Sequence, residues 1–143
     1  MHTFSEGENL DQTFWTYINP KITDLCRDKF ENGFYADSVE TALKEINNLI
    51  KVKYKSISGE ELDGARLMNK VFSVNNPIFH FADLSSETGR NIQQGYMQIF
   101  TGSMIGIRNP KAHNNLNPNK LLSIHLLQIS SFLMCKIEEI GIV

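Results

Sequence analysis

The stretch GIRNPKAHNN, residues 106–115, contains an arginine and a histidine five positions apart, Arg108 and His113. An arginine keeps its positive charge at any working pH and binds phosphate oxygens through a planar fork of N–H donors. A histidine accepts or donates a proton near neutral pH. Together the two side chains could cleave an RNA phosphodiester without a metal ion. The ribose 2′-hydroxyl would attack the adjacent phosphate, Arg108 would stabilise the developing charge, and His113 would transfer a proton.

The same pair also has a purely structural interpretation. The chain contains four arginines and four histidines, so a pair at about this spacing arises readily by chance. An arginine at the C-terminus of a helix also stabilises the last carbonyl groups and the helix dipole without any further role. The spacing alone leaves both interpretations open.

Two long helices are predicted to flank this stretch. Apolar residues recur at spacings of three and four over residues 86–108, which predicts a helix. Asn109 precedes a proline and is biased out of the α-helical region, so this helix should end near Arg108. Asn117, with the proline after it, predicts the start of the last helix. A chain that turns back between two helices brings Arg108 and His113 close enough to face one pocket.

The rest of the chain shows the same helical periodicity and few alternating β-branched runs. The predicted elements are a helical region over 9–30 broken at Asn19 by a proline, a long amphipathic helix over 34–54, a polar connector over 56–64, a short helix over 65–72 and an irregular loop over 73–87. The sequence therefore predicts one all-α domain over residues 1–143, a four-helix bundle with minor extra helices.

The helix over 86–108 is apolar nearly all round, which predicts burial on both sides. In so short a chain, a second subunit is expected to cover one of those sides, with Met97 and Met104 at the dimer interface. Gly95, Gly102 and Gly106 fall on one side of the helix. Since glycine is unfavourable inside a helix, they predict the close approach of a neighbouring backbone.

Composition limits the kinds of partner. The chain has 143 residues, 41% hydrophobic and 21% charged, with a net charge of −2, which excludes a protein that coats polyanions through a global basic field. Any contact with RNA must be local. Lys111, inside the motif, is well placed to touch phosphate. In KVKYK, Lys51 and Lys53 are candidate contacts to the RNA backbone and Tyr54 could stack a base, although the segment also fits a solvated helix end.

Two polar residues flank the apolar face of the helix over 34–54. Glu40 and Asn47 could reach the site and orient His113, or they could be ordinary boundary residues. His125 lies among leucines on the last helix, where a core histidine is predicted.

Several kinds of site and compartment are excluded or disfavoured. No HExxH, HxE or paired-cysteine pattern is present, so neither zinc nor another cofactor is expected, and no GxxxxGK[ST] loop occurs. Cys26 and Cys135 are predicted to be reduced core residues. No apolar run approaches the length of a membrane span, and the first residues lack the pattern of a signal peptide. A cytoplasmic protein with no membrane contact is expected.

The sequence resembles the HEPN superfamily of all-α domains, whose motif is Arg, four to six residues, then His, often with a polar residue after the arginine. Here these residues are Arg108, Asn109 and His113. Within the superfamily the chain is most similar to the Ymh-like family of conserved hypothetical proteins, over roughly residues 18 to 114. The matching segments are INPKI, FENGFYADSVETALKEIN, GARLMNKVFS, NNPIF and ETGRNIQQGYMQIFTGSMIGIRNPKAH.

The resemblance implies a dimeric bundle in which the motifs of two chains meet in a cleft. Active members of the superfamily are metal-independent endoribonucleases of toxin–antitoxin, phage-defence and abortive-infection systems. It implies that Arg108, His113 and Asn109 are catalytic, that RNA is the substrate, and that an antitoxin or defence-system partner exists. Other members have lost catalysis and bind RNA or a partner protein, and the net charge of −2 favours that alternative. The family often has His where this chain has Asn19, so Asn19 receives no catalytic role.

Overall fold

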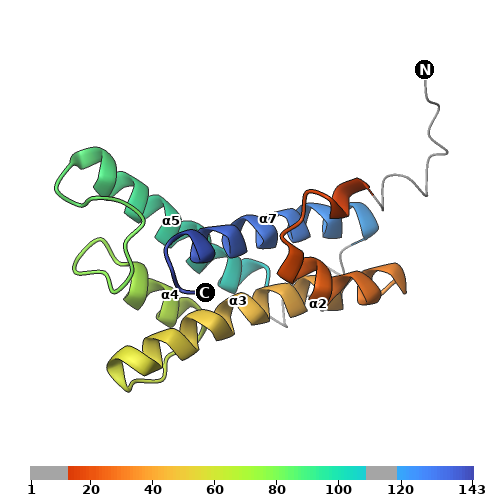
Figure 1. Cartoon of the computed structure of the whole chain (residues 1–143), viewed down its shortest axis with the longest axis horizontal. Helices are drawn as coiled ribbons and strands as arrows, with labels where there is room; N and C mark the ends of the chain where they lie inside the picture. The colour runs from red at the N-terminus through yellow and green to blue at the C-terminus, as the bar shows by residue number, and fades with distance from the viewer. Residues whose placement is uncertain (1–12, 109–118) are drawn as a thin grey trace.

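The fold is that of a computed structural model, which describes residues 13–108 and 119–143. Every regular element in these residues is helical, which confirms the predicted all-α bundle (Figure 1). A short helical turn at residues 13–15 precedes the main elements. These are α2 (Pro20–Glu31), α3 (Tyr35–Ser58), α4 (Gly64–Phe72), α5 (Glu87–Gly106) and α7 (Lys120–Glu139).

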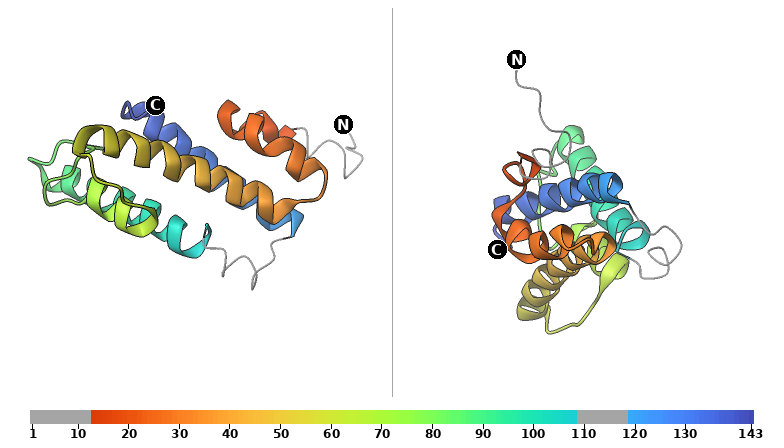
Figure 2. Two further views of the ribbon diagram at one scale, coloured as in Figure 1. Left: turned by 90° about the horizontal axis from the view of Figure 1, so that it is seen from below. Right: turned by 90° about the vertical axis from the view of Figure 1, so that its right-hand side faces the viewer.

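Helix α3 is the centre of the bundle. It packs against both α2 and α7, while α4 packs mainly against α5. Figure 2 (left) shows α2 on one side of the long α3 and α4 and α5 on the other. The buried side chains of α3 follow the spacing of three and four that the sequence predicted: Val39, Ala42, Leu43, Ile46 and Ile50.

Gln93 connects α5 to the loop between α4 and α5. Its buried amide donates hydrogen bonds to the carbonyl oxygens of Phe72 and Phe79, at 2.9 and 3.0 Å, and accepts one from the Phe81 N–H at 2.8 Å. The rings of Phe72 on α4 and Phe100 on α5 also contact each other, with their centres 4.8 Å apart. These contacts hold α4 and α5 together as one rigid pair.

Asn19 has a structural role, at the start of α2. Its side chain accepts a hydrogen bond from the Lys21 N–H at 3.0 Å, so it caps the helix, with Pro20 at the first helical position. Its own N–H donates to the Ser131 hydroxyl at 2.8 Å and its amide to the Glu138 carboxylate at 2.7 Å, both on α7.

Three predicted boundaries differ from the structure. Helix α3 continues to Ser58 and ends at Gly59, whose φ is 75°, so the segment from residue 56 is not yet a connector. Helix α5 ends at Gly106, two residues before Arg108. Helix α7 begins at Lys120 with the Asn119 side chain as its cap, later than the predicted start.

Burial of α5 was predicted wrongly in two respects. Met104 is only 3% exposed and belongs to the core of its own chain, so it is not a dimer-interface residue. Met97 is half-buried against the same core. At Gly95, Gly102 and Gly106 an added Cβ would meet no atom within 4 Å, so no neighbouring backbone among the described residues approaches them. The glycine-bearing side of α5 is therefore not covered by the backbone of residues 13–108 or 119–143.

By length and composition, α7 could cross a membrane, since its 20 residues contain a window of mean hydropathy 1.3. One such helix is weak evidence of a membrane span, since core helices of soluble proteins meet the same criteria, so the expectation of no membrane contact stays a prediction. One face of α7 packs on α3 and buries serines as well as Leu127, Leu133 and Ile137. On the same helix Cys135 is exposed, not in the core as predicted, and its sulfur accepts a hydrogen bond from the Asn19 amide at 3.5 Å. Cys26 is buried, and burial raises the pKa of its thiol to about 12.

Candidate functional site

Arg108 lies just beyond the C-terminus of α5. Its backbone N–H donates to the Ser103 carbonyl at 3.0 Å, and the same carbonyl accepts the Ile107 N–H at 3.1 Å. This closing turn directs the Arg108 side chain away from the end of α5 and towards the start of α4. The side chain is 22% exposed, so most of it is covered by protein.

The guanidinium group of Arg108 lies against the first residues of α4. Its Nη1 atom is 3.6 Å from Oδ1 of Asp63. Its Nη2 atom lies over Gly64, where an added Cβ would be only 2.9 Å away. The Nε atom is enclosed and has no hydrogen-bond partner in the described residues. The guanidinium group of Arg108 therefore contacts the start of α4 and not the end of α5, the helix that Arg108 follows.

Asn47, on α3, fixes the residues that hold Arg108. Its side-chain amide donates a hydrogen bond to Asp63 Oδ1 and accepts one from the Gly64 N–H at 2.9 Å. Asn47 is 5% exposed and therefore rigidly placed. We refer to Asn47, Asp63, Gly64 and Arg108 as the Arg108 cluster.

Asp63 carries a negative charge in this cluster at neutral pH. Partial burial raises the pKa of its carboxyl, but the hydrogen bond from Asn47 and the charges of Arg108 and Lys51 outweigh burial and hold that pKa below its usual value. Lys51, half-buried on α3, therefore lies near enough to act on the cluster. Among the described residues, the positive charges of Arg108 and Lys51 both act on the Asp63 carboxylate.

The structure brings some predicted site residues together and separates others. Asn47 and Lys51 lie at the Arg108 cluster, whereas Glu40 forms an ion pair with Lys44 on its own helix at 3.2 Å. Lys53 is exposed on α3. The described residues do not include Asn109, Lys111 or His113.

The predicted role of Tyr54 in stacking a base is wrong. Its ring is 1% exposed and lies in the core. Its hydroxyl donates to the Glu60 carboxylate at 2.8 Å. A nucleotide base cannot reach this ring.

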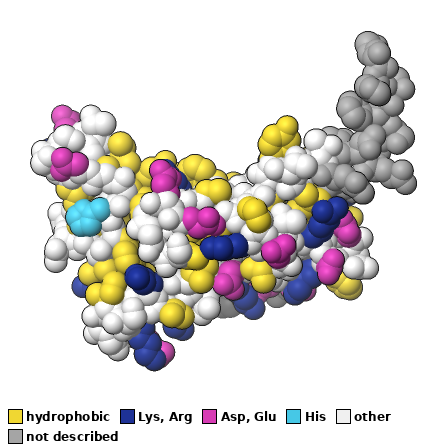
Figure 3. Space-filling model, viewed as in Figure 1, with side chains coloured by type: hydrophobic (Ala, Val, Ile, Leu, Met, Phe, Trp, Pro, Cys, Tyr) yellow, Lys and Arg dark blue, Asp and Glu magenta, His cyan; other side chains and the backbone are white. Residues whose placement is uncertain are grey.

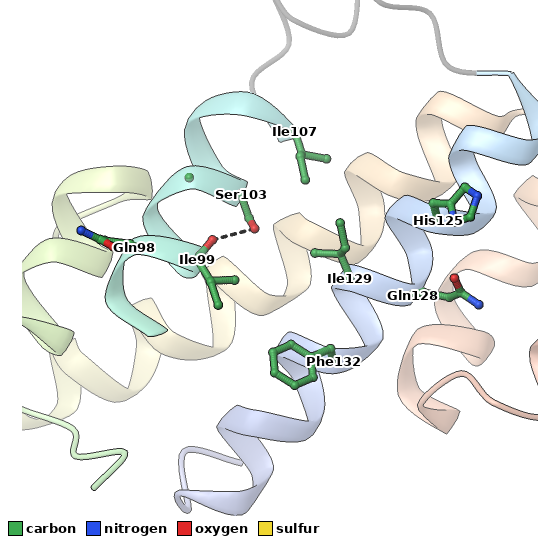
Figure 4. A pocket seen from close by; sticks show the side chains of 9 residues that line it. Gln98, Ile99, Ser103, Ile107, His125, Gln128, Ile129 and Phe132 are labelled. Carbon is green, nitrogen blue, oxygen red and sulfur yellow. Dashed lines mark hydrogen bonds between the residues drawn. The ribbon is translucent and has the colours of Figure 1, made fainter. Parts of the chain in front are cut away.

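A groove with a volume of about 620 Å³ separates α5 from α7 (Figure 4). The Ser103 hydroxyl donates its hydrogen bond to the carbonyl of Ile99 at 2.8 Å, so it does not donate one into the groove. The lining side chains are largely apolar. They are Gln98, Ile99, Gly102, Ser103 and Ile107 of the α5 side and His125, Gln128, Ile129 and Phe132 of α7.

The groove runs from an aromatic contact to the neighbourhood of Arg108. At one end the rings of Tyr96 and Phe132 are stacked 6.0 Å apart, and Lys136 Nζ lies 4.6 Å from the centre of the Tyr96 ring. At the other end are His125 and Ile107, the residue before Arg108. The apolar groove and the Arg108 cluster are therefore adjacent.

His125 is exposed on the wall of this groove, so the prediction of a core histidine is wrong. The buried face of α7 contains Ser123, Ser130 and Ser131 beside Leu127 and Leu133. Because serines replace apolar residues on that face, the sequence pattern misled the assignment of faces on this helix.

Sequence reasoning also missed Asp63 and Gly64, which it placed in a polar connector. The available signal was an Asp-Gly pair directly before a predicted helix, which is typical of a helix start. In the part of the chain that is described, no three histidine, cysteine, aspartate or glutamate side chains are grouped to hold a metal ion.

Comparison with known proteins identifies the family but no function. No curated protein and no solved structure matches the chain. The model of the family described as "Protein of unknown function (Hypoth_ymh)" matches residues 16–137, from before α2 to near the end of α7 and through Asn47, Asp63 and Arg108. The chain therefore belongs to the Hypoth_ymh family.

Proposed function

We propose that this protein is a metal-independent endoribonuclease of the HEPN type, with Arg108 and His113 as its central catalytic residues. The observation that carries the proposal is the placement of the Arg108 guanidinium. If Arg108 served only to stabilise the C-terminus of α5, its fork would bind the last carbonyls of that helix. Instead it lies over Gly64 and beside Asp63, on another element. This placement favours a role beyond capping.

The reaction needs a charge stabiliser and a proton-transfer group. The 2′-oxygen attacks phosphorus and loses its proton, the P–O5′ bond breaks, and the departing 5′-oxygen gains a proton. The products are a 2′,3′-cyclic phosphate and a 5′-hydroxyl. Arg108 stabilises the charge on the phosphate, His113 transfers a proton, and Asn109 positions them. Lys111, Lys51 and Lys53 contact the RNA backbone.

A homodimer supplies what one chain lacks. The reaction benefits from both a base and an acid, and the motif of one chain contains a single histidine. In the groove, Ile99, Ile129 and Phe132 expose 38–44% of their surface next to Ile107. A second copy that covers this groove about a two-fold axis brings a second Arg108–His113 pair towards the first. Met97, predicted at the dimer interface, does not line this groove and is half-buried against the core of its own chain.

We place the enzyme in the cytoplasm as a toxin or phage-defence effector. Indiscriminate cleavage of cellular RNA would harm the host cell, so an antitoxin or defence-system partner holds the enzyme inactive until it is needed.

The second candidate function is a non-catalytic module that binds RNA or a partner protein. Acidic and basic side chains are interspersed on the face shown in Figure 3, and the net charge is −2. Asp63 also offsets part of the positive potential at Arg108. Both features weaken the attraction of RNA compared with a basic surface.

Cleavage of total RNA in EDTA by the purified protein tests the first proposal. We expect cyclic-phosphate ends from the wild type, and a loss of about 100-fold or more in Arg108→Ala and His113→Ala. Arg66→Ala and His80→Ala, which alter exposed residues of the same types, serve as matched controls and keep full activity. If the wild type leaves RNA intact while it still binds RNA, the module is the correct function.

A further inference from the structure

Asp63, which lies outside the Arg–His motif, is the nearest charged group to Arg108 in the described chain. We propose that Asp63 is a positioning residue that holds the Arg108 guanidinium in the orientation that receives the scissile phosphate. Asn47 in turn holds Asp63. This inference rests on the proposed function and adds to it a residue that acts through Arg108.

The distance between the two charges favours positioning over blocking. Nη1 of Arg108 is 3.6 Å from Asp63 Oδ1, which is longer than the 2.7–3.2 Å of an N–H···O hydrogen bond. The same oxygen already accepts a hydrogen bond from Asn47. The carboxylate therefore orients the guanidinium by its charge and leaves the Nη donors available. A tight bidentate pair would have occupied those donors.

Gly64 limits the space on the other side of the guanidinium group. A Cβ at this position would be 2.9 Å from Nη2, and the φ of Gly64 is +59°, a left-handed conformation that favours glycine. The Gly64 N–H is fixed by the Asn47 side chain. Arg108 thus lies between the Asp63 carboxylate and the Gly64 backbone, both of which Asn47 holds by hydrogen bonds.

This arrangement is unfavourable for stability alone. The Nε–H of Arg108 is enclosed and has no acceptor in the described residues, and an unsatisfied buried donor is destabilising. Proteins tend to retain such costs at functional sites. Since Nε is enclosed, a phosphate that binds the guanidinium does so at the Nη groups, the same groups that Asp63 and Gly64 orient.

The test distinguishes the loss of one negative charge near the site from the loss of Arg108 positioning. Asp63→Asn removes one negative charge and retains an oxygen that can accept the Asn47 hydrogen bond. Glu61→Gln is the matched control, because it removes the same charge two residues earlier, where Glu61 pairs with Lys55 at 2.9 Å. A change in general RNA attraction affects both variants alike. Loss of positioning affects only Asp63→Asn.

With the full-length protein and an RNA oligonucleotide, we expect Asp63→Asn to lower kcat by about tenfold while KM is unchanged or lower. Glu61→Gln should keep the wild-type kcat. An increase of kcat in Asp63→Asn would mean that Asp63 blocks the phosphate, and an unchanged kcat would mean that it does not position Arg108. Either result overturns the inference.

Hydrogen exchange of the Arg108 Nε–H, followed by NMR, is a second readout that does not depend on catalysis. We expect exchange to be about tenfold faster in Asp63→Asn than in the wild type, because the guanidinium becomes mobile. Glu61→Gln should be unchanged. If wild-type protein shows no cleavage, the proposed function fails while this readout still decides whether Asp63 positions Arg108. Equal exchange in all three proteins overturns the positioning role.

Discussion

The Arg108 cluster and the groove between α5 and α7 meet at consecutive residues, Arg108 and Ile107, yet within the described residues only the cluster is closed by contacts. In the cluster, α3, α4 and the residue beyond α5 contribute polar groups that fix one another through hydrogen bonds and charge. In the groove, Ile99 and Phe132 remain 43% and 44% exposed. Hydrogen bonds have direction and can fix a site within a chain. Apolar surface is stabilised only when something covers it.

The largest expected effect concerns the groove. Ile129→Asp introduces a charge into the surface that we propose a second copy covers, so the dimer dissociation constant should rise by at least about 100-fold. Sedimentation velocity over a range of concentrations measures it. Val52→Asp is the control, since Val52 is an exposed aliphatic residue on α3 outside the groove, and it should leave the dimer intact. A wild-type protein that is monomeric at every concentration would contradict the prediction.

Next in size is a change that breaks the cluster. Asn47→Ala removes two hydrogen bonds and leaves the Gly64 N–H without its acceptor, so the free energy of unfolding should fall by about 2–3 kcal/mol. Asn48→Ala alters the exposed neighbour on the same helix and should change stability by less than about 0.5 kcal/mol. Urea unfolding of both variants gives the difference. Equal losses would show that the cluster contributes nothing to stability.

Alanine substitutions at two glycines distinguish an effect on stability from an effect on RNA cleavage. Gly64 and Gly59 both have left-handed φ, +59° and +75°, so alanine at either should cost about 1–2 kcal/mol in thermal unfolding. Only at Gly64 does the new Cβ meet Arg108, whereas nothing lies within 4 Å at Gly59. Gly64→Ala should therefore also reduce RNA cleavage, and Gly59→Ala should not. Cleavage that falls equally in both would refute the contact with Arg108.

The smallest effect tests whether the groove is covered. Alanine in place of a glycine inside a helix is favourable by about 1 kcal/mol where space allows, as it does at Gly95, which lies outside the groove lining. Gly102 lies within the lining, and a second copy there would meet the added methyl group. Gly95→Ala should raise the unfolding temperature more than Gly102→Ala. The same rise in both would indicate that nothing packs at Gly102.

The sequence predicted the elements better than the site. The face formed by Val39, Leu43 and Ile46, and the cap-and-proline pair at Asn19, were confirmed because they depend on residues close in the chain. Met104, Tyr54 and His125 were placed wrongly. Each of them could point to the core or to the surface, and which one occurs depends on where neighbouring helices lie.

By itself, the sequence determined the all-α class, the existence of the helices that the structure shows as α2, α3, α4, α5 and α7, and the position of Arg108 near a helix end, since periodicity and capping act over a few positions. Only the tertiary structure decided that Asn47 and Asp63, 16 positions apart, meet at Arg108, and that α5 and α7 leave an open groove beside it. The physical reason is that a hydrogen bond or a covered surface between helices depends on their packing. That packing results from all the buried side chains together, and a local sequence pattern does not predict it.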